Sequence, residues 1–410
     1  MRVLIIGGGA AGMVVAWRTA SAGHRATLLE ANGKLGVKLR ISGGGKCNIT
    51  HDGSVKELLA AFPKDQARFL RPSVHRFTNA DVVDLLRREG VETYVRENGR
   101  VFPADRPGSA AAVVAAFQGL VERAGVEVRL RARVAGLEGR RPRLEGLHLE
   151  DGTSIAADAV VLACGGASYP ETGTRGESLS WLKGLGLPVR SWFPALAPIP
   201  LKHPHPEWEG VALREGRLWL RAGAEGKRLA SFAGDVLFTR DGLSGPAALE
   251  LSQPAEAARR SGAAWLAYAS VAEPPEAVDA ALQAEMKANP QLKAATWLQR
   301  HLPERLCEAL VAEAGLPQDQ RLKDLPKAGR RALVAAVTEL PLGEPGAVNL
   351  ARGEVAAGGL KLEAVDPQTM RVRGFDNLWA CGEVLDLDGP VGGYNLQAAF
   401  STGFVAGELG

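Results

Sequence analysis

Six residues near the start of the chain have the types and the spacing of a phosphate-binding loop. The segment Gly7–Gly12, Gly-Gly-Gly-Ala-Ala-Gly, fits the pattern G-x-G-x-x-G. In this pattern Gly7 permits a tight turn, Gly9 lets the backbone approach a pyrophosphate, and Gly12 allows a helix to pack closely on a strand. Glu30, further along, is a carboxylate that can accept hydrogen bonds from a ribose. These residues predict a dinucleotide site, and on their own they do not separate NAD from FAD.

Three more glycine clusters lie far apart in the sequence. The segment 42–48 reads SGGGKCN, the segment 165–173 follows an apolar run, and the segment 381–397 contains Gly-Glu and then GGYNLQ. Three successive glycines suit a loop that lies flat against a planar ligand. The N-terminus of the last helix, near Gly393, offers N–H groups to a negative charge, which suits the N1–C2=O edge of a reduced flavin. This last feature favours FAD over NAD.

Apolar periodicity predicts the elements that must position these clusters. Residues 2–6, 10–22 and 26–30 are typical of a strand, a helix and a second strand, which together form a βαβ unit. Further helices are expected at 79–89, 109–124 and 394–408, and further strands at 126–134, 143–149, 153–157 and 159–164. The pair Asp151-Gly152 suits the positive φ of a hairpin turn.

The composition changes near residue 190. Five prolines lie within 194–206, short strands with glycine turns are expected over 210–252, and helices are expected at 275–286, 292–301, 303–315 and 327–338. From 371 the pattern returns to strand, glycine loop and helix. We therefore expect an α/β fold in which a Rossmann-like domain, 1–190 and 341–410, is interrupted by an inserted domain at 191–340.

The bulk properties exclude several classes of protein. The 410 residues are 46% hydrophobic and 23% charged with a net charge of +3, so nucleic acid or a membrane surface is an unlikely partner on electrostatic grounds. The four cysteines include no C-x-x-C pair, so neither a redox-active dithiol nor a metal site is expected. The absence of a signal peptide and of a run of about 18 apolar residues predicts a cytoplasmic protein.

Segments along the whole chain resemble the HI0933-like (BaiN/RdsA-type) family of FAD-dependent flavoproteins. In the order of the family, the matching segments are 7–12, 38–48, 165–173, 238–246, 356–359 and 381–397. The resemblance implies a split FAD-binding domain of the glutathione-reductase type. It also implies an insert made of a β-barrel, about 191–270, and a helical part, about 271–340.

The resemblance implies a set of FAD contacts by position. These are Gly9, Ala11, Gly12, Glu30, Lys38, Lys46, Cys47, Gly165, Gly382, Glu383, Asn395 and Leu396, with Val134 as a backbone contact on the adenine side. The loop chemistry adds Gly7, Ala10, Ser42, Gly43, Gly44, Asn48 and Gly393.

The chain departs from the family pattern in three places. Lys46 stands where the family has arginine, which keeps the charge and loses the planar fork. Gly176-Glu177-Ser178 stands where the family often has Gly-Asp-Gly. The segment 355–360, which borders the substrate side of the flavin in the family, also differs, so the resemblance does not give the substrate.

The predicted chemistry is that of a FAD-dependent oxidoreductase with a small-molecule substrate. The sequence holds no second G-x-G-x-x-G, so any NAD(P)H must dock transiently as electron donor. One hypothesis is NAD(P)H-driven reduction of an activated alkene such as an enone, and an alternative is an amine or aminoketone oxidase that uses O₂. A third is a FAD-dependent RNA-modifying or RNA-binding flavoprotein, for which Lys323, Lys327, Arg330 and Arg331 form a basic helical face.

The candidate catalytic residues near the flavin are Lys46, Tyr169 and Tyr394, with Glu383 as a further candidate for acid–base work. Each has a simpler explanation as well. Tyr394 can merely pack against the flavin ring, and Glu383 can hold the ribitol or a backbone N–H.

Overall fold

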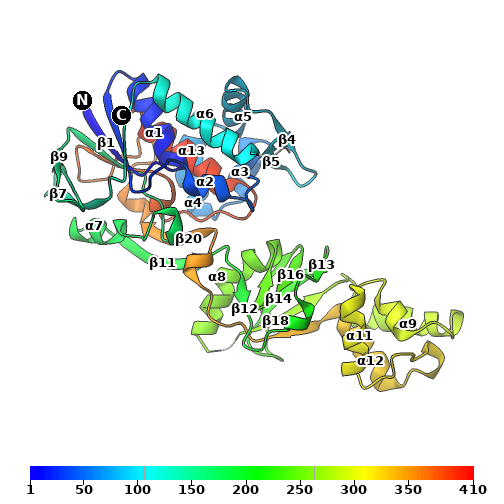
Figure 1. The fold of residues 1–410 in the computed structure, drawn as a ribbon. Helices are drawn as coiled ribbons and strands as arrows, with labels where there is room; N and C mark the ends of the chain where they lie inside the picture. Colours follow the sequence, from blue (N-terminus) through cyan, green and yellow to red (C-terminus); the bar gives the residue numbers. More distant parts are fainter. Residues whose placement is uncertain (105–107, 263) are drawn as a thin grey trace. The chain divides into compact units, whose positions relative to one another are not determined.

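The computed structural model describes residues 1–104, 108–262 and 264–410. The chain divides into two compact units, one formed by Met1–Phe193 together with Leu350–Gly410, and the other by Pro194–Asn349 (Figure 1). The boundary expected at residue 340 needs correction, because β19 (Leu340–Gly343) pairs with β18 (Trp265–Ala269) inside the second unit. Both ends of the chain therefore build the first unit.

A parallel five-stranded sheet lies at the centre of the first unit. Its strand order is β21 (Leu378–Ala380), β10 (Ala159–Leu162), β1 (Arg2–Ile6), β2 (Arg25–Glu30) and β6 (Glu127–Leu130). The apolar residues of β1 and β10 are fully buried, as expected for a parallel sheet that is covered on both faces. The strand expected over 126–134 is shorter, because Arg131 has a φ of 56° and ends the extended run.

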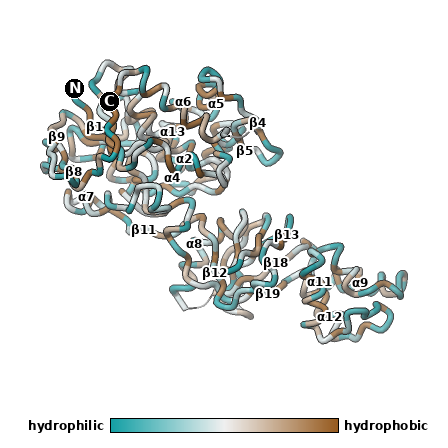
Figure 2. Tube along the Cα trace, viewed as in Figure 1, coloured by the Kyte–Doolittle hydropathy of each residue, from teal (hydrophilic) through white to brown (hydrophobic). Residues whose placement is uncertain are grey.

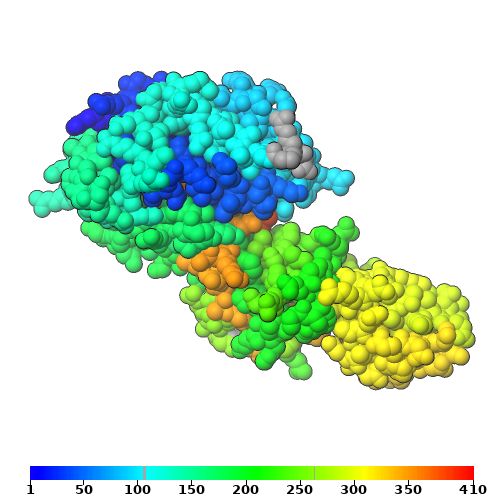
Figure 3. All heavy atoms as spheres, viewed as in Figure 1, coloured from blue at the N-terminus to red at the C-terminus, as the bar shows by residue number. Residues whose placement is uncertain are grey.

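Helices from the two ends of the chain pack against each other beside this sheet. Figure 1 shows α13 (Tyr394–Ala406) among elements of the N-terminal half, close to α1 (Ala10–Ser21). A methyl group on Gly403 would lie 2.8 Å from the Ala11 carbonyl oxygen, so the small residues of α13 permit this close packing. In Figure 3 the N-terminal half covers almost all of α13 on the face shown.

The other elements of the first unit support its loops. Its remaining helices are α2 (Val37–Ile41), α3 (Val55–Ala60), α4 (Lys64–Arg76), α5 (Asn79–Arg88), α6 (Ser109–Arg123) and α7 (Ser178–Gly184), with the 3-10 turns η1 (Pro170–Thr172), η4 (Leu350–Arg352), η5 (Leu362–Ala364) and η6 (Gly382–Val384). Its remaining strands form the sheets β3 (Thr50–His51), β5 (Arg100–Pro103), β4 (Thr93–Val95) and β7 (Val134–Arg140), β8 (Arg143–Leu149), β9 (Ser154–Ala156), while β20 (Val355–Leu360) pairs with β11 (Val189–Ala195). Asp151-Gly152 forms the predicted turn between β8 and β9, with φ of 86° at the glycine.

The second unit combines two four-stranded sheets with helices. The sheets are β12 (Ile199–Pro200), β17 (Gly242–Ser244), β16 (Val236–Thr239), β13 (Ala212–Leu213) and β15 (Arg228–Ala233), β14 (Arg217–Arg221), β18, β19. The helices are α8 (Pro246–Arg260), α9 (Pro275–Ala288), α10 (Ala294–Leu298), α11 (Glu304–Glu313) and α12 (Lys327–Thr338), with the 3-10 turns η2 (Pro206–Trp208) and η3 (Leu322–Asp324). The expectation of strand up to residue 252 was wrong, because α8 begins at Pro246 and buries small side chains such as Ala247 and Ala248 against the sheets.

The hydropathy of the chain agrees with this arrangement. Figure 2 shows hydrophobic residues interspersed with hydrophilic ones in the strands of the second unit. In β14 the buried Leu218 and Leu220 alternate with more exposed residues, as a strand with one covered face requires. Within the described part of the chain, every helix is too short or too polar to cross a membrane.

Candidate functional site

The glycine clusters that are far apart in sequence meet at one edge of the parallel sheet. Gly7 follows β1, Gly165 follows β10 and Gly382 follows β21, and these three strands are neighbours in the order β21-β10-β1. The carboxyl ends of parallel strands lie at the same edge, which is where open α/β sheets bind ligands. Close approach confirms the convergence, since a methyl group on Gly7 would lie 2.5 Å from the Ala163 oxygen and one on Gly382 would lie 2.9 Å from the Ala11 Cβ.

The first cluster leaves space in front of the helix that it begins. Gly9 is the N-cap of α1, and no side chain caps the N–H groups at the start of this helix. A methyl group on Gly9 would meet no atom of the described residues within 4 Å, whereas one on Gly12 would lie 1.7 Å from the Gly7 oxygen. Gly12 is therefore required by the packing of the protein itself. Gly9 faces open space at an uncapped helix N-terminus, which fits a pyrophosphate.

Glu30 holds the glycine loop in place. Its carboxylate lies at the end of β2 and is 8% exposed. One oxygen accepts a hydrogen bond of 2.7 Å from Gly8 N–H, and the other accepts one of 2.7 Å from Asn32 N–H. An ionised carboxylate has about four acceptor positions, so Glu30 retains capacity for ribose hydroxyls.

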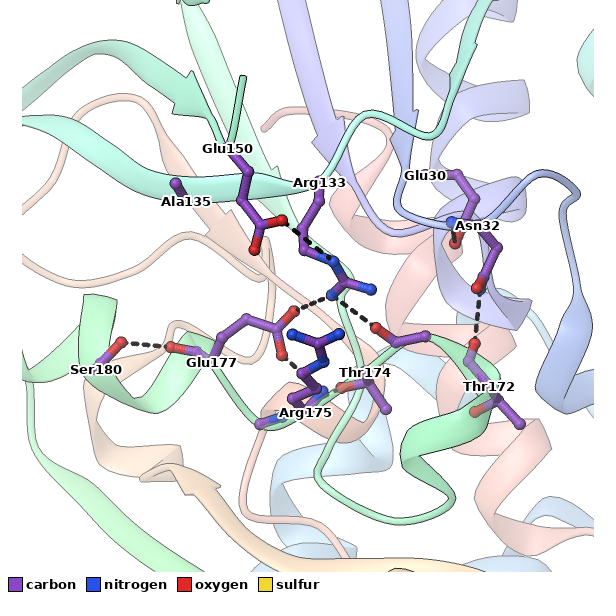
Figure 4. A network of polar contacts seen from close by, with 12 residues as sticks. Glu30, Asn32, Arg133, Ala135, Glu150, Thr172, Thr174, Arg175, Glu177 and Ser180 are labelled. Atoms are coloured by element: carbon purple, nitrogen blue, oxygen red, sulfur yellow. Dashed lines mark hydrogen bonds and ion pairs between the residues drawn. The ribbon is translucent and has the colours of Figure 1, made fainter. Parts of the chain in front are cut away.

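A polar network joins the segment after β10 to the residues that follow β2 and to the residue that precedes β7 (Figure 4). The Arg133 guanidinium donates to the Gly173 oxygen at 2.9 Å and pairs with Glu177 Oε1 at 2.9 Å. The Asn32 amide donates to the Thr172 oxygen at 2.7 Å. Val134 follows Arg133 directly, so the network also fixes the strand start at which the adenine-side contact was expected. The departure at Glu177 from the family pattern thus has a structural role in this chain.

The SGGGKCN loop runs through left-handed backbone conformations at its three glycines and at Cys47, which has φ of 56°. Gly43, Gly44 and Gly45 have φ of 58°, 67° and 81°. Methyl groups on Gly44 and Gly45 would meet no atom of the described residues within 4 Å, so this backbone is open to a ligand. The Ser42 hydroxyl donates to the Leu39 oxygen at 2.8 Å, which leaves the backbone rather than this hydroxyl as the donor to a ligand.

Lys46 and Cys47, two neighbouring residues of this loop, have opposite environments. The side chain of Lys46 is exposed, whereas Cys47 is fully buried. Burial raises the pKa of the Cys47 thiol to about 12, against a smaller lowering effect of Ser42. A thiol of this kind is almost wholly protonated at neutral pH and is a poor nucleophile, so Cys47 acts here as a packing residue.

The two asparagines predicted as FAD contacts are used to hold the loops together. In the orientation that pairs donors with acceptors, Asn48 donates to Thr50 O at 3.1 Å and accepts from Gly393 N–H at 2.9 Å. Asn395 accepts from Gly389 N–H at 2.8 Å and donates to the Gly389 oxygen at 2.7 Å. Their side chains thereby join the second cluster to the start of α13. Contacts from this region to a ligand therefore fall mainly to the backbone.

A charged pair ties the third and fourth clusters to α2. Lys38 Nζ lies 2.8 Å from Glu383 Oε2 and 2.6 Å from Ser168 Oγ. Glu383 Oε1 also accepts from Ala356 N–H at 2.9 Å. Glu383 is therefore a carboxylate that is paired with Lys38 and that holds neighbouring segments together. This agrees with the simpler explanation, in which Glu383 holds a backbone N–H.

The two tyrosines predicted as catalytic lie in different parts of this region. The Tyr394 ring stacks on His51, with centroids 4.6 Å apart, and meets the edge of Phe62. Tyr169 precedes η1 in a left-handed conformation with φ of 50°, and its N–H donates to the Ala351 oxygen at 3.1 Å. The catalytic roles of Lys46, Tyr169 and Tyr394 stay predictions.

Sequence patterns did not single out Asn32, Arg133 or Ser168. Their roles depend on contacts with residues more than a hundred positions away, or on loops that no local pattern joins. Taken together, the open glycine backbone, the uncapped start of α1 and the carboxylate at the end of β2 fit the pyrophosphate and ribose of FAD.

Comparison with known proteins also indicates a Rossmann-type domain, and the similarity extends over almost the full length of the chain. The family model described as HI0933-like protein Rossmann domain matches residues 1–409. A ribosomal RNA dihydrouridine synthase of Escherichia coli (strain K12) is 29% identical, covering 99% of this chain and 96% of that protein. A 3-dehydro-bile acid delta(4,6)-reductase of Clostridium scindens is 27% identical, covering 99% and 98%.

A solved structure shares the fold at much lower identity. The 3-ketosteroid delta1-dehydrogenase from Sterolibacterium denitrificans superposes with a TM-score of 0.53 at 15% identity, covering 99% of this chain and 98% of that one. The Rossmann-type architecture of the first unit thus has a counterpart of similar length.

Proposed function

Because this chain belongs to the HI0933-like family and is a FAD-dependent oxidoreductase, we propose that it reduces a carbon–carbon double bond conjugated to a carbonyl, with NAD(P)H as electron donor. The observation that carries the proposal is what two full-length relatives have in common. Dihydrouridine differs from uridine by saturation of a double bond conjugated to a carbonyl, and a 4,6-reductase of a 3-dehydro bile acid is named for the same kind of bond.

The residues of the sheet edge have roles in holding and orienting under this proposal. Bound FAD would supply the redox chemistry, taking a hydride from NAD(P)H and delivering it to the β-carbon of the substrate. The Gly9 backbone and the start of α1 would hold the pyrophosphate, and Glu30 would hold the ribose. The Gly393 N–H donates to Asn48, so the N–H groups that follow it in the first turn of α13 would be the ones offered to the negative edge of the ring.

Anaerobic mixing tests the electron donor and the acceptor separately. We expect NADH or NADPH to bleach the flavin absorbance, and 2-cyclohexen-1-one, added next, to restore it. Bleaching by a primary amine together with no bleaching by either nucleotide would overturn the proposal in favour of an oxidase.

RNA is a second candidate substrate, favoured by one surface of the second unit. Leu218 and Leu220 of β14 are buried, so Arg217, Trp219 and Arg221 occupy the opposite face of the sheet. The Arg228 guanidinium lies 3.9 Å from the Trp219 ring centroid, and that of Arg217 lies 5.6 Å from it. Stacked arginine and tryptophan side chains are typical of surfaces that bind single-stranded nucleic acid.

This surface weakens the expectation, which was drawn from the net charge, that nucleic acid is an unlikely partner. A net charge of +3 describes the whole chain and not one sheet face. Ion pairs reduce the free positive charge of both surfaces. Arg330 Nε lies 2.8 Å from Asp279 Oδ1 on the basic helical face proposed from the sequence, and Arg221 and Arg228 both pair with Glu339 on the sheet face.

Filter binding of a uridine-rich RNA oligonucleotide distinguishes the two surfaces. Arg217→Ala combined with Arg228→Ala should weaken binding at low salt by about tenfold, since each contributes to phosphate contact and stacking. Arg331→Ala on α12 is the matched control and should leave binding unchanged. No retention of RNA by the unaltered protein at low salt would remove this candidate and leave a small conjugated carbonyl compound as the substrate.

A further inference from the structure

Arg131 has a strained backbone conformation at the end of an outer strand of the parallel sheet. It follows β6 directly and has φ of 56°, a left-handed conformation that residues with a Cβ adopt only with strain. Its N–H donates to the Asn32 oxygen at 2.9 Å, and the next residue, Ala132, donates to the Glu30 oxygen at 2.9 Å. The surrounding loops therefore hold Arg131 in this conformation. Strain that is retained in this way is concentrated at ligand sites.

The strand order indicates which end of FAD would reach this place. The order β10-β1-β2-β6 runs across the sheet. The uncapped start of α1 follows β1 and fits the pyrophosphate, and Glu30 ends β2 and fits the ribose of the adenosine. Because these two places lie on successive strands, an adenine carried by that ribose would continue toward β6, and the flavin would lie on the side of β10. Arg131 is the first residue beyond the carboxyl end of β6.

The Arg131 side chain lies beside the turn that follows Glu30. A methyl group on Gly33 would lie 3.6 Å from Arg131 Nε and 3.7 Å from its Nη2. The side chain is exposed, and within the part of the chain that the structure describes no residue forms an ion pair with it. Arg133 differs, since Figure 4 shows its guanidinium directed toward Glu177, with which it pairs at 2.9 Å. The planar cation of Arg131 is therefore available to a ligand.

We propose that the Arg131 guanidinium stacks on the adenine ring of bound FAD. Guanidinium planes stack on nucleobases and on other aromatic faces. Such a contact strengthens binding by about 3- to 30-fold. This inference rests on the proposed binding of FAD at this edge of the sheet. It adds a side-chain contact to the adenine, for which the family resemblance implied only the backbone of Val134.

Titration of the apoprotein with FAD and with ADP tests the contact. ADP carries the adenine, the ribose and the pyrophosphate without the flavin, so Arg131→Met should weaken the binding of both ligands by about 3- to 30-fold. Arg129→Met is the matched control, because Arg129 is exposed on β6 and pairs with Glu127, and it should bind both ligands like the unaltered protein. Unchanged affinity of Arg131→Met for FAD or for ADP would overturn the inference.

Salt and a lysine substitution separate stacking from an ion pair with a phosphate. An exposed ion pair is screened by salt, whereas stacking depends little on ionic strength. The ratio of the FAD affinities of the unaltered protein and Arg131→Met should therefore be the same at low and at high salt. Arg131→Lys keeps the charge and loses the plane, so it should bind FAD almost as weakly as Arg131→Met. A ratio that falls toward one at high salt, or full affinity in Arg131→Lys, would assign Arg131 to a phosphate and overturn the inference.

Arg131→Gly separates a role in binding from a role in folding. Glycine adopts φ of 56° without strain, so this apoprotein should unfold at the same denaturant concentration as the unaltered one or at a higher concentration. It should nevertheless bind FAD about 3- to 30-fold more weakly. A less stable apoprotein would show that the side chain serves the fold, and unchanged FAD affinity would show that it does not touch the adenine. Either result would contradict the inference.

The outcomes distinguish the inference from the cofactor site on which it rests. If the unaltered apoprotein binds neither FAD nor ADP, the proposed cofactor site is wrong and the inference is wrong with it. If it binds both and the Arg131 variants bind them equally well, the cofactor site stands and the assignment of Arg131 is wrong.

Discussion

Glu30 holds the glycine loop in place, and we propose that it also binds the ribose of FAD. Its two oxygens accept the N–H groups of Gly8 and Asn32, each at 2.7 Å. We expect Glu30→Ala to weaken FAD binding by about 10- to 100-fold, because hydrogen bonds to a charged group contribute about 1.5–3 kcal/mol. Fluorescence titration of the apoprotein with FAD measures this change. Glu97→Ala, at an exposed glutamate of the same unit, should bind FAD like the unaltered protein.

At the scale of elements, the Arg133–Glu177 ion pair should stabilise the segment that follows β10, and this contribution to the free energy of unfolding should be measurable. Its side chains are 18% and 28% exposed, so solvent screens the pair only in part. A double-mutant cycle with Arg133→Met and Glu177→Gln, measured by denaturant unfolding, should give a coupling energy of about 0.5–1.5 kcal/mol. Additive effects of the two substitutions would contradict the role assigned to this network.

Helix α8 of the second unit carries a pH-dependent anchor. Arg259 above all, then Arg260 and the Val348 N–H, lower the pKa of the buried Glu256 to about 2, against the opposing effect of desolvation. A lowered folded-state pKa contributes stability above the unfolded-state value, and this contribution is lost as the pH falls toward 2.

The corresponding variant is Glu256→Gln. At pH 7 it should lower the free energy of unfolding by about 3 kcal/mol, because lowering a pKa by one corresponds to about 1.4 kcal/mol and the pKa of Glu256 falls from 4.5 to about 2. The difference from the unaltered protein should shrink between pH 4.5 and 2. Unfolding curves recorded across this pH range provide the measurement, and a difference that stays constant would refute the assignment.

Sequence periodicity predicted the elements whose burial is regular and missed those whose local signals conflict. Strands β1 and β2 and helices α1, α5, α6 and α12 lie within one or two residues of their expected bounds. Helices α4 and α8 were missed, and each contains an internal proline, Pro72 or Pro254, which ordinarily disfavours a helix interior. Packing against α13 and against the insert sheets outweighs that local cost.

The candidate site was predictable in its glycines and not in its side-chain partners. Gly7–Gly12 and Glu30 follow from local spacing within one βαβ unit. Arg133 and Glu177 meet across 44 residues, and Lys38 and Glu383 meet across 345. Such contacts form only when the folded sheet brings distant segments together, so no local sequence pattern predicts them.

At the scale of the whole molecule, the first unit is assembled from residues 1–193 and 350–410. The strand order places β21, from the C-terminal part, beside β10 and next but one to β1. The ligand edge therefore requires both ends of the chain to fold together. A protein shortened before β21 should lose FAD binding altogether, which equilibrium dialysis with FAD measures.

We propose above all that the open space in front of Gly9 holds the pyrophosphate of FAD. Gly9 has φ of −83° and ψ of −162°, which alanine adopts without strain, and a methyl group there would meet no described atom within 4 Å. Gly9→Ala should therefore fold with the stability of the unaltered apoprotein. Gly184→Ala, at another uncrowded glycine, serves as the control.

Titration of the apoproteins with FAD is the direct measurement. We predict that the unaltered protein and Gly184→Ala bind FAD alike and that Gly9→Ala, though folded, binds it at least about tenfold more weakly, a loss of about 1.4 kcal/mol. Equal affinity of Gly9→Ala and the unaltered protein for FAD would contradict the account.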